Sequence, residues 1–209
     1  MQETERSKLN DVFDKNHRIV ALVGNKSNGK TNNMIHLALN HRSKVKDVDM
    51  FAYGLPKSVS KWLKKKHNIR EISTLNQLVT KKNCILFIDE FEKLKLNDRR
   101  YKDELDEFVD FVYHNNVYVI LCSPNIREFN SIIGGAIERW LLKSVRLDQC
   151  INGSQLKKIV DGYKGSNKVL KSIVVPKDTI LVINDEEEKE IICEYVPEAD
   201  TKANNEELF

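Results

Sequence analysis

The sequence has no hydrophobic run long enough to cross a membrane. No apolar stretch approaches the ~18 residues that a transmembrane helix requires. The polar residues 1–6 are not followed by an apolar segment, so we expect no secretory signal peptide. These two absences predict a soluble protein without a membrane span, located in the cytoplasm.

Cysteine is scarce and forms no recognisable motif. The four cysteines, Cys84, Cys122, Cys150 and Cys193, are scattered without C-x-x-C spacing. At least two of them fall in predicted core strands, where a reduced thiol behaves as a small apolar side chain. The sequence therefore indicates neither a zinc site nor a disulfide framework.

The chain also lacks a strong net charge. A formal charge of +3 is too small to indicate nucleic-acid binding by itself. Cations are nevertheless concentrated around Trp62, in a basic helix that could contact a phosphate backbone. A solvated helix face, anchored to the core by Trp62, is the favoured interpretation. The cations concerned are Lys57, Lys61, Lys64, Lys65, Lys66 and Arg70.

Short apolar runs alternate with helical patterns along most of the chain. Its 209 residues suit one α/β domain with a small appendage. Near-continuous apolar strands separated by helices predict a mostly parallel sheet with helices on both faces. The predicted strands are 18–23, 48–53, 84–88, 117–122 and 140–145, with a short extended piece at 69–72. The predicted helices follow residue 31, span 58–66, begin at Ser73 or Thr74, span 101–114 and contain Ile132.

Residues 24–31 fit the phosphate-binding pattern G-x-x-x-x-G-K-[ST], between a predicted strand and a predicted helix. Gly24 and Gly29 allow backbone angles that point successive amide hydrogens at phosphate oxygens. Lys30 would reach the β- and γ-phosphates, and Thr31 would offer its hydroxyl to Mg²⁺. A glycine turn with a solvated lysine is the disfavoured alternative. The predicted ATP-binding residues are Gly24, Asn25, Lys26, Ser27, Asn28, Gly29, Lys30, Thr31 and Asn32.

A second buried strand, at residues 84–88, ends in the acidic pair Asp89 and Glu90. Nucleotide hydrolysis needs one carboxylate to hold Mg²⁺ and another to orient or deprotonate the attacking water. We assign Asp89 to the metal and Glu90 to the water. Acidic residues commonly end strands, so this interpretation depends on the phosphate loop upstream. Together the two motifs predict a Mg²⁺-dependent ATPase.

The last quarter of the chain differs from the rest. Residues 179–183 and 191–196 resemble strands and flank a polar segment, which predicts a β-hairpin at one sheet edge. We divide the chain into an N-terminal segment (1–17), an ATPase core (18–150), a C-terminal helix and β-hairpin extension (151–196) and a mobile tail (197–209).

The order of these motifs resembles the FtsK-HerA superfamily of DNA-pumping ATPases. The resemblance spans residues 18–146. It includes His114-Asn115-Asn116 before the next strand and Ser123-Pro124-Asn125 after it. The chain is most similar to viral DNA-packaging ATPases of the poxvirus, membrane-containing-virus and small tailed-phage kinds. The resemblance implies a RecA-like P-loop NTPase that acts as a hexameric or pentameric ring on double-stranded DNA. It also implies a virus or mobile element, with a capsid or portal protein as a further partner, in the host cytoplasm or a virion.

The resemblance implies two further roles. In the family a polar sensor, often glutamine, ends the strand after the acidic pair, and here Ser123 or Asn125 takes that place. A turn or helix-capping role explains either residue equally well. An arginine supplied across the subunit boundary would stabilise charge on the transferring phosphoryl. The candidates are Arg127, which we prefer, then Arg139, and Arg99 and Arg100.

Three function classes remain open from the sequence. The first and preferred class is a motor that translocates or packages double-stranded DNA. The second is a P-loop ATPase that acts on a protein or loads a helicase. The third is a nucleotide-dependent switch, or an assembly or secretion factor similar to the phage assembly ATPases. A small-molecule kinase is disfavoured because Glu90 suits water activation and no arginine-rich lid follows residues 117–122.

Overall fold

Strands and helices alternate through most of the described chain. The computed structural model describes residues 13, 17–25, 29–45, 47–78, 80–94, 102–124, 129, 131–143, 179–184 and 188–192. The strands are β1 (Ile19–Gly24), β2 (Asp49–Tyr53), β3 (Arg70–Glu71), β4 (Cys84–Ile88), β5 (Val117–Ser123), β6 (Arg139–Lys143), β7 (Thr179–Asn184) and β8 (Glu188–Ile192). The helices are α1 (Lys30–Lys44), α2 (Lys57–His67), α3 (Lys102–His114) and α4 (Ser131–Ala136), with 3₁₀ turns η2 (Leu75–Leu78) and η3 (Phe91–Lys93).

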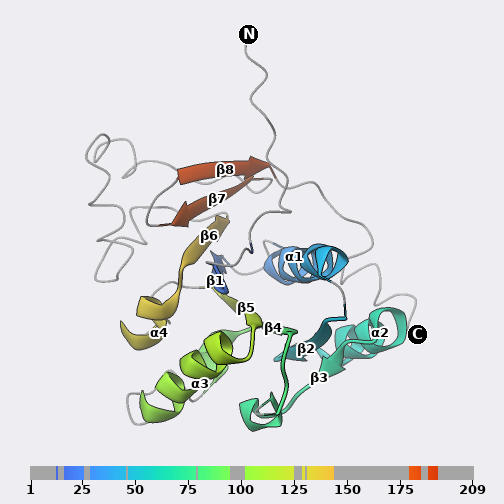
Figure 1. The fold of residues 1–209 in the computed structure, drawn as a ribbon. Helices are drawn as coiled ribbons and strands as arrows, with labels where there is room; N and C mark the ends of the chain where they lie inside the picture. Colours follow the sequence, from blue (N-terminus) through green and yellow to red (C-terminus); the bar gives the residue numbers. More distant parts are fainter. Residues whose placement is uncertain are drawn as a thin grey trace, which may run out of the picture.

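The strands form one sheet in the order β3-β2-β4-β5-β1-β6-β7-β8 (Figure 1). From β3 to β6 every neighbouring pair is parallel, and β7 and β8 add an antiparallel hairpin beside β6. The carboxyl ends of six parallel strands therefore meet at one edge of the sheet. Ligands bind at this edge in open α/β sheets.

Helices cover both faces of the sheet, as its buried strands require. Successive residues of β1 contribute to two different apolar clusters: Ala21 faces one and Leu22 the other. Helices α1 and α2 pack on the Leu22 side, through residues such as Met34 and Trp62. Helices α3 and α4 pack on the Ala21 side. The fold is a RecA-like α/β sandwich, as the sequence predicts.

Two cysteines lie in the centre of the sheet. Cys84 in β4 and Cys122 in β5 are fully buried. Burial, and secondarily the charge of Asp49, raises the pKa of the Cys84 thiol to about 12. The thiol therefore stays neutral. Cys150 and Cys193 lie outside the described residues.

Two predicted elements differ from the structure. The helix expected from Ser73 or Thr74 is a single 3₁₀ turn, η2. The Gln77 side chain accepts hydrogen bonds from the backbone N–H groups of Ser73 (2.8 Å) and Thr74 (3.3 Å), which closes this short turn. The second hairpin strand begins at Glu188 rather than at residue 191. Strand β8 lies at the edge of the sheet, beside β7. Edge strands often carry charged residues, and these mask the apolar pattern by which a strand is recognised in the sequence.

Other predictions agree or cannot be compared. The hairpin itself is confirmed. Trp62 is buried against the core, as the favoured interpretation of the basic helix expects. The expected C-terminal helix after residue 151 and the tail 197–209 lie outside the described residues. No helix in the described ranges is long and apolar enough to cross a membrane.

Candidate functional site

The phosphate loop begins where β1 ends and finishes in the first turn of α1. Gly29 precedes α1 with φ +73°, a left-handed conformation that glycine adopts without strain. The helix N-terminus, which favours anions, therefore faces the loop. The ammonium group of Lys30 donates a hydrogen bond of 2.8 Å to the carbonyl oxygen of Asn25. Asn32 follows in the first helical turn and is half-buried. Lys26, Ser27 and Asn28 lie outside the described residues.

Gly24 is required by a close approach of two strands. It pairs with Lys143 at the carboxyl end of β6. A Cβ atom at position 24 would lie 2.3 Å from the carbonyl oxygen of Lys143, a distance that real side chains do not show. The first glycine of the motif thus lets β6 lie against the start of the phosphate loop.

Thr31 in α1 and Asp89 after β4 lie together, although β5 separates β4 from β1, the strand before α1. The Thr31 hydroxyl donates a 2.7 Å hydrogen bond to Oδ2 of Asp89, and Asp89 is 8% exposed. A hydroxyl and a buried carboxylate are hard oxygen ligands of the kind that Mg²⁺ prefers. The described residues contain no group of three or more His, Cys, Asp or Glu placed to hold a metal. Mg²⁺ needs only a few ligands from the protein, because it usually keeps several waters and binds substrate phosphates. The donor set therefore fits the ion.

Glu90 has an unusual backbone conformation. Its φ of 52° lies in the left-handed region, which non-glycine residues adopt at a cost. Its backbone N–H donates a 3.0 Å hydrogen bond to Oδ1 of Asp89, so the turn also fixes the neighbouring carboxylate. The Glu90 carboxylate forms an ion pair with Lys93, three residues later in η3. Both side chains are exposed at the catalytic edge, where Glu90 is 44% accessible.

Strand β5 lies between the phosphate-loop strand β1 and the acidic strand β4. Its last residue, Ser123, is fully buried and pairs with Val23. Ser123 is thus at the same sheet edge as Gly24 and Asp89. Its expected companions, Asn125 and Arg127, lie outside the described residues, as do Arg99 and Arg100.

The structure disfavours one of the arginine candidates. Arg139 pairs with Val20 at the amino end of β6, which is the sheet edge opposite the phosphate loop. Its side chain is 8% exposed and lies 3.1 Å from Nδ1 of His17. A guanidinium that reaches into a neighbouring subunit must be exposed. The expectation that Arg139 is the second choice for this role is therefore not supported by its position.

Two residues near the site were missed by the sequence analysis. Gly54 follows β2 with φ +78°, and a Cβ atom there would lie 2.3 Å from the carbonyl oxygen of Asp89. Lys143 ends β6 beside Gly24 and is only 5% exposed. A glycine directly after a predicted strand and a lone lysine within an apolar run were the available signals. Neither signal predicts a contact with the phosphate loop or the acidic pair unless the order of the strands in the sheet is known.

Comparison with solved structures identifies the fold. B204, the DNA-packaging ATPase of Sulfolobus turreted icosahedral virus, is 14% identical with a TM-score of 0.62, and the match covers 86% of this chain and 100% of B204. The B204 genome-packaging NTPase of Sulfolobus turreted icosahedral virus 2, in complex with AMPPCP, is also 14% identical (TM-score 0.57; 88% and 100% covered). The cytoplasmic domain of the type VII secretion ATPase EccC from Thermomonospora curvata is 11% identical (TM-score 0.58; 87% and 24% covered). The resemblance to viral packaging ATPases is therefore confirmed at the level of fold.

Sequence comparison supplies the family. No curated protein sequence matches the chain. Residues 20–144 match the family described as "ATPase family associated with various cellular activities (AAA)". This range includes both the phosphate loop and the acidic pair, and it spans more than half of the chain. The protein is therefore an ATPase and belongs to the AAA family.

Proposed function

We propose that this ATPase drives the movement of double-stranded DNA, as the packaging motor of a virus or mobile element. The observation that carries the proposal is the match to B204, a DNA-packaging ATPase whose whole length is covered by this chain. Secretion ATPases share the fold too, but the chain covers only 24% of EccC. A shared fold does not by itself imply a shared function, so the substrate needs a direct test.

The site supports a specific division of roles in hydrolysis. On nucleotide binding, Lys30 would exchange the carbonyl oxygen of Asn25 for β- and γ-phosphate oxygens. Thr31 and Asp89 would hold Mg²⁺, which when bound neutralises charge on the phosphates. Glu90 would accept a proton from water as the water oxygen bonds to the γ-phosphorus. The bond between that phosphorus and the β,γ-bridging oxygen then breaks, giving ADP and phosphate.

Further groups complete the proposed site. Ser123 is our candidate sensor for the γ-phosphate, because it ends the strand between Gly24 and Asp89. Asn125 is the alternative sensor. Arg127 is our candidate for the arginine supplied by a neighbouring subunit, in a ring of five or six copies. A capsid or portal protein would be a further partner, in the host cytoplasm or the virion.

A second candidate function is an ATPase that acts on a protein partner. The shared fold with the secretion ATPase EccC favours this alternative over a helicase loader or a switch. Such an enzyme would need its partner for full turnover and would be indifferent to DNA.

The test is steady-state ATP hydrolysis with Mg²⁺, with and without linear double-stranded DNA, across a range of protein concentrations. A DNA-driven ring predicts stimulation by DNA and activity that rises more than linearly with protein. Glu90→Gln provides the control for contaminating ATPases. Turnover that ignores both DNA and protein concentration would reject the DNA motor and leave the protein-directed ATPase.

A further inference from the structure

Two exposed helix faces of this chain carry charges of opposite sign. Helix α2 presents five exposed lysines and contains no acidic residue, while its apolar side, including Trp62 and Leu63, is buried. Helix α3 presents five exposed carboxylates and buries Leu105, Phe108 and Val112. The α2 lysines are Lys57, Lys61, Lys64, Lys65 and Lys66. The α3 carboxylates are Asp103, Glu104, Asp106, Glu107 and Asp110.

Each cluster is unfavourable for the isolated helix that carries it. Lys57 and Lys61 are four residues apart, as are Asp106 and Asp110, and like charges at this spacing destabilise a helix. The helix dipole favours carboxylates in the first turn and cations in the last turn. The dipole therefore accounts for the position of Asp103 and of the lysines in the last turn of α2. It does not account for Lys57 or Asp110. An external group of opposite charge would account for both clusters.

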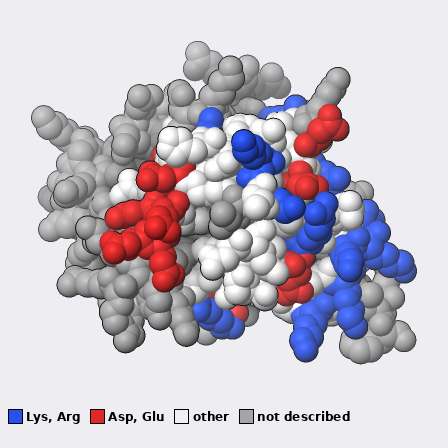
Figure 2. All heavy atoms as spheres, turned by 60° about the horizontal axis from the view of Figure 1, so that its bottom comes forward, with Lys and Arg blue, Asp and Glu red and all other residues white. Residues whose placement is uncertain are grey.

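The two clusters do not neutralise each other within one subunit. Helices α2 and α3 pack on opposite faces of the sheet (Figure 1). Figure 2 shows them well apart, with acidic side chains over α3 on the left and basic side chains over α2 on the right. Within the described ranges, none of these ten side chains forms an ion pair.

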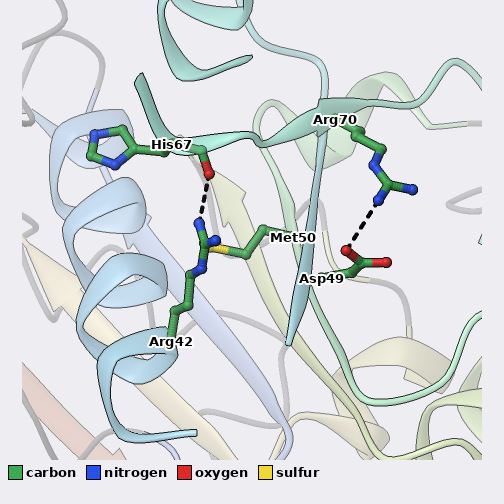
Figure 3. A network of polar contacts seen from close by, with 5 residues as sticks. All are labelled: Arg42, Asp49, Met50, His67 and Arg70. Atoms are coloured by element: carbon green, nitrogen blue, oxygen red, sulfur yellow. Dashed lines mark hydrogen bonds and ion pairs between the residues drawn. The ribbon is translucent and has the colours of Figure 1, made fainter. Parts of the chain in front are cut away.

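Polar contacts hold the basic helix in place. Arg42 of α1 donates a 2.6 Å hydrogen bond to the carbonyl oxygen of His67, the last residue of α2, and also lies 3.8 Å from the sulfur of Met50 (Figure 3). Nearby, Arg70 pairs with Asp49 at 3.1 Å, so its charge is already balanced. The lysine face is thus a separate surface on a fixed helix.

We propose that the basic face of α2 docks on the acidic face of α3 in a second copy of this chain. The two faces have comparable lengths: about 14 Å from Lys57 to Lys66 and about 11 Å from Asp103 to Asp110, at about 1.5 Å per residue. Because the two surfaces differ, the contact is head-to-tail, and repeating it builds a ring or a filament. A nucleic acid would match only the basic face. The proposal rests on the ring assembly proposed above and assigns the helices that form its interface.

Charge reversal on each face tests the contact. One variant changes four α2 lysines to glutamate: Lys57, Lys61, Lys64 and Lys65. The other changes four α3 carboxylates to lysine: Asp103, Asp106, Glu107 and Asp110. A third variant combines both sets, and Lys81→Glu/Lys82→Glu, between η2 and β4, is the control outside both helices. Self-association is measured by sedimentation velocity across protein and salt concentrations, and folding by thermal unfolding.

Each single-face variant should weaken self-association by at least about tenfold, because like charges then face each other. The combined variant, and an equal mixture of the two single-face variants, should restore it, since opposite charges meet again. Wild-type association should also weaken as salt rises.

If the wild type associates but folded single-face variants associate equally well, this interface is wrong. The interface is likewise wrong if folded combined variants and mixtures fail to recover. A wild type that stays monomeric at all concentrations rejects the interface and the ring together, whereas DNA-independent turnover by an associating wild type rejects only the DNA motor.

Discussion

The hydroxyl of Thr31 donates a 2.7 Å hydrogen bond to Oδ2 of Asp89, which lies 58 residues later in the chain. The bond links the first turn of α1 to the end of β4, across the intervening strand β5. The other carboxylate oxygen of Asp89 accepts a hydrogen bond from the backbone of Glu90. Both oxygens of Asp89 are therefore fixed at the sheet edge where the phosphate loop begins. This preorganisation predicts a metal-dependent role for Asp89.

Asp89→Asn should weaken binding of MgATP more than binding of metal-free ATP. The amide keeps the shape of the side chain but removes the negative charge that an ion requires. We expect a rise in Kd for MgATP of roughly tenfold to a hundredfold, as for loss of a charged polar contact worth about 1.5–3 kcal/mol. Calorimetry with Mg²⁺ and with a chelator measures the two affinities. Equal losses in both conditions would show that Asp89 supports the loop rather than the ion.

Glu90→Gln should keep nucleotide binding and lose turnover. Glutamine has nearly the same size but cannot accept a proton from water, and a positioned general base contributes about 100-fold to 10,000-fold to the rate. Binding of a fluorescent ATP analogue and steady-state phosphate release separate the two effects. Hydrolysis at the wild-type rate would assign water activation to another group.

Lys93→Gln should raise turnover modestly. Lys93 forms an ion pair with Glu90, and this pair must loosen before the carboxylate can contact water. Exposed pairs contribute about 0–1 kcal/mol, which limits the expected increase in kcat to about fivefold. The control is the same substitution in a Glu90→Gln background, where no increase is expected. A fall in kcat instead would mean that Lys93 contributes a favourable charge to the reaction.

The sequence predicted those parts of the site that local residue patterns encode. The phosphate loop and the acidic pair are contiguous motifs, and their neighbouring strands are apolar runs, so the sequence alone predicts both. The parallel sheet followed from the same runs. The Thr31 to Asp89 contact was implied by the motif chemistry, and the structure supplies its geometry.

Other features depend on tertiary contacts that carry no local signal. The approach of Gly54 to Asp89 exists only because β2 and β4 are neighbours in the sheet. The burial of Arg139 at the opposite edge follows from the register of β6 on β1. The start of β8 was missed because its edge position permits the charged residues Glu188, Lys189 and Glu190.

Gly54→Ala should impair the site by displacing Asp89 rather than by removing a contact with nucleotide. The added Cβ would lie 2.3 Å from the carbonyl oxygen of Asp89, and φ of +78° is strained for alanine. The left-handed conformation alone costs about 1–2 kcal/mol. We expect a lower melting temperature and weaker MgATP binding. Gly135→Ala, at an exposed position in α4, is the matched control and should not lower stability, because alanine favours helices. Equal behaviour of the two variants would contradict the contact.

The buried histidine His41 should make stability depend on pH. Its ring lies between Phe13 and Tyr118, with ring centroids 4.8 Å and 4.3 Å away. Burial, and secondarily the charge of Lys44, lowers the pKa of His41 from 6.5 to about 4. As pH falls below about 6.5 the unfolded chain binds a proton that the folded chain does not. Stability is therefore fully present above that pH and is lost progressively down to about pH 4.

The loss should reach up to about 3 kcal/mol, since each unit of pKa shift corresponds to about 1.4 kcal/mol. Urea unfolding at a series of pH values between 4 and 7 measures it. His41→Phe keeps an aromatic ring between Phe13 and Tyr118 but cannot be protonated, so its stability should fall less over the same range. Carboxylate groups also titrate below pH 5, and they are common to both proteins, so the difference between the two curves isolates the histidine. Parallel curves would mean that His41 is protonated in the folded chain as readily as in the unfolded one.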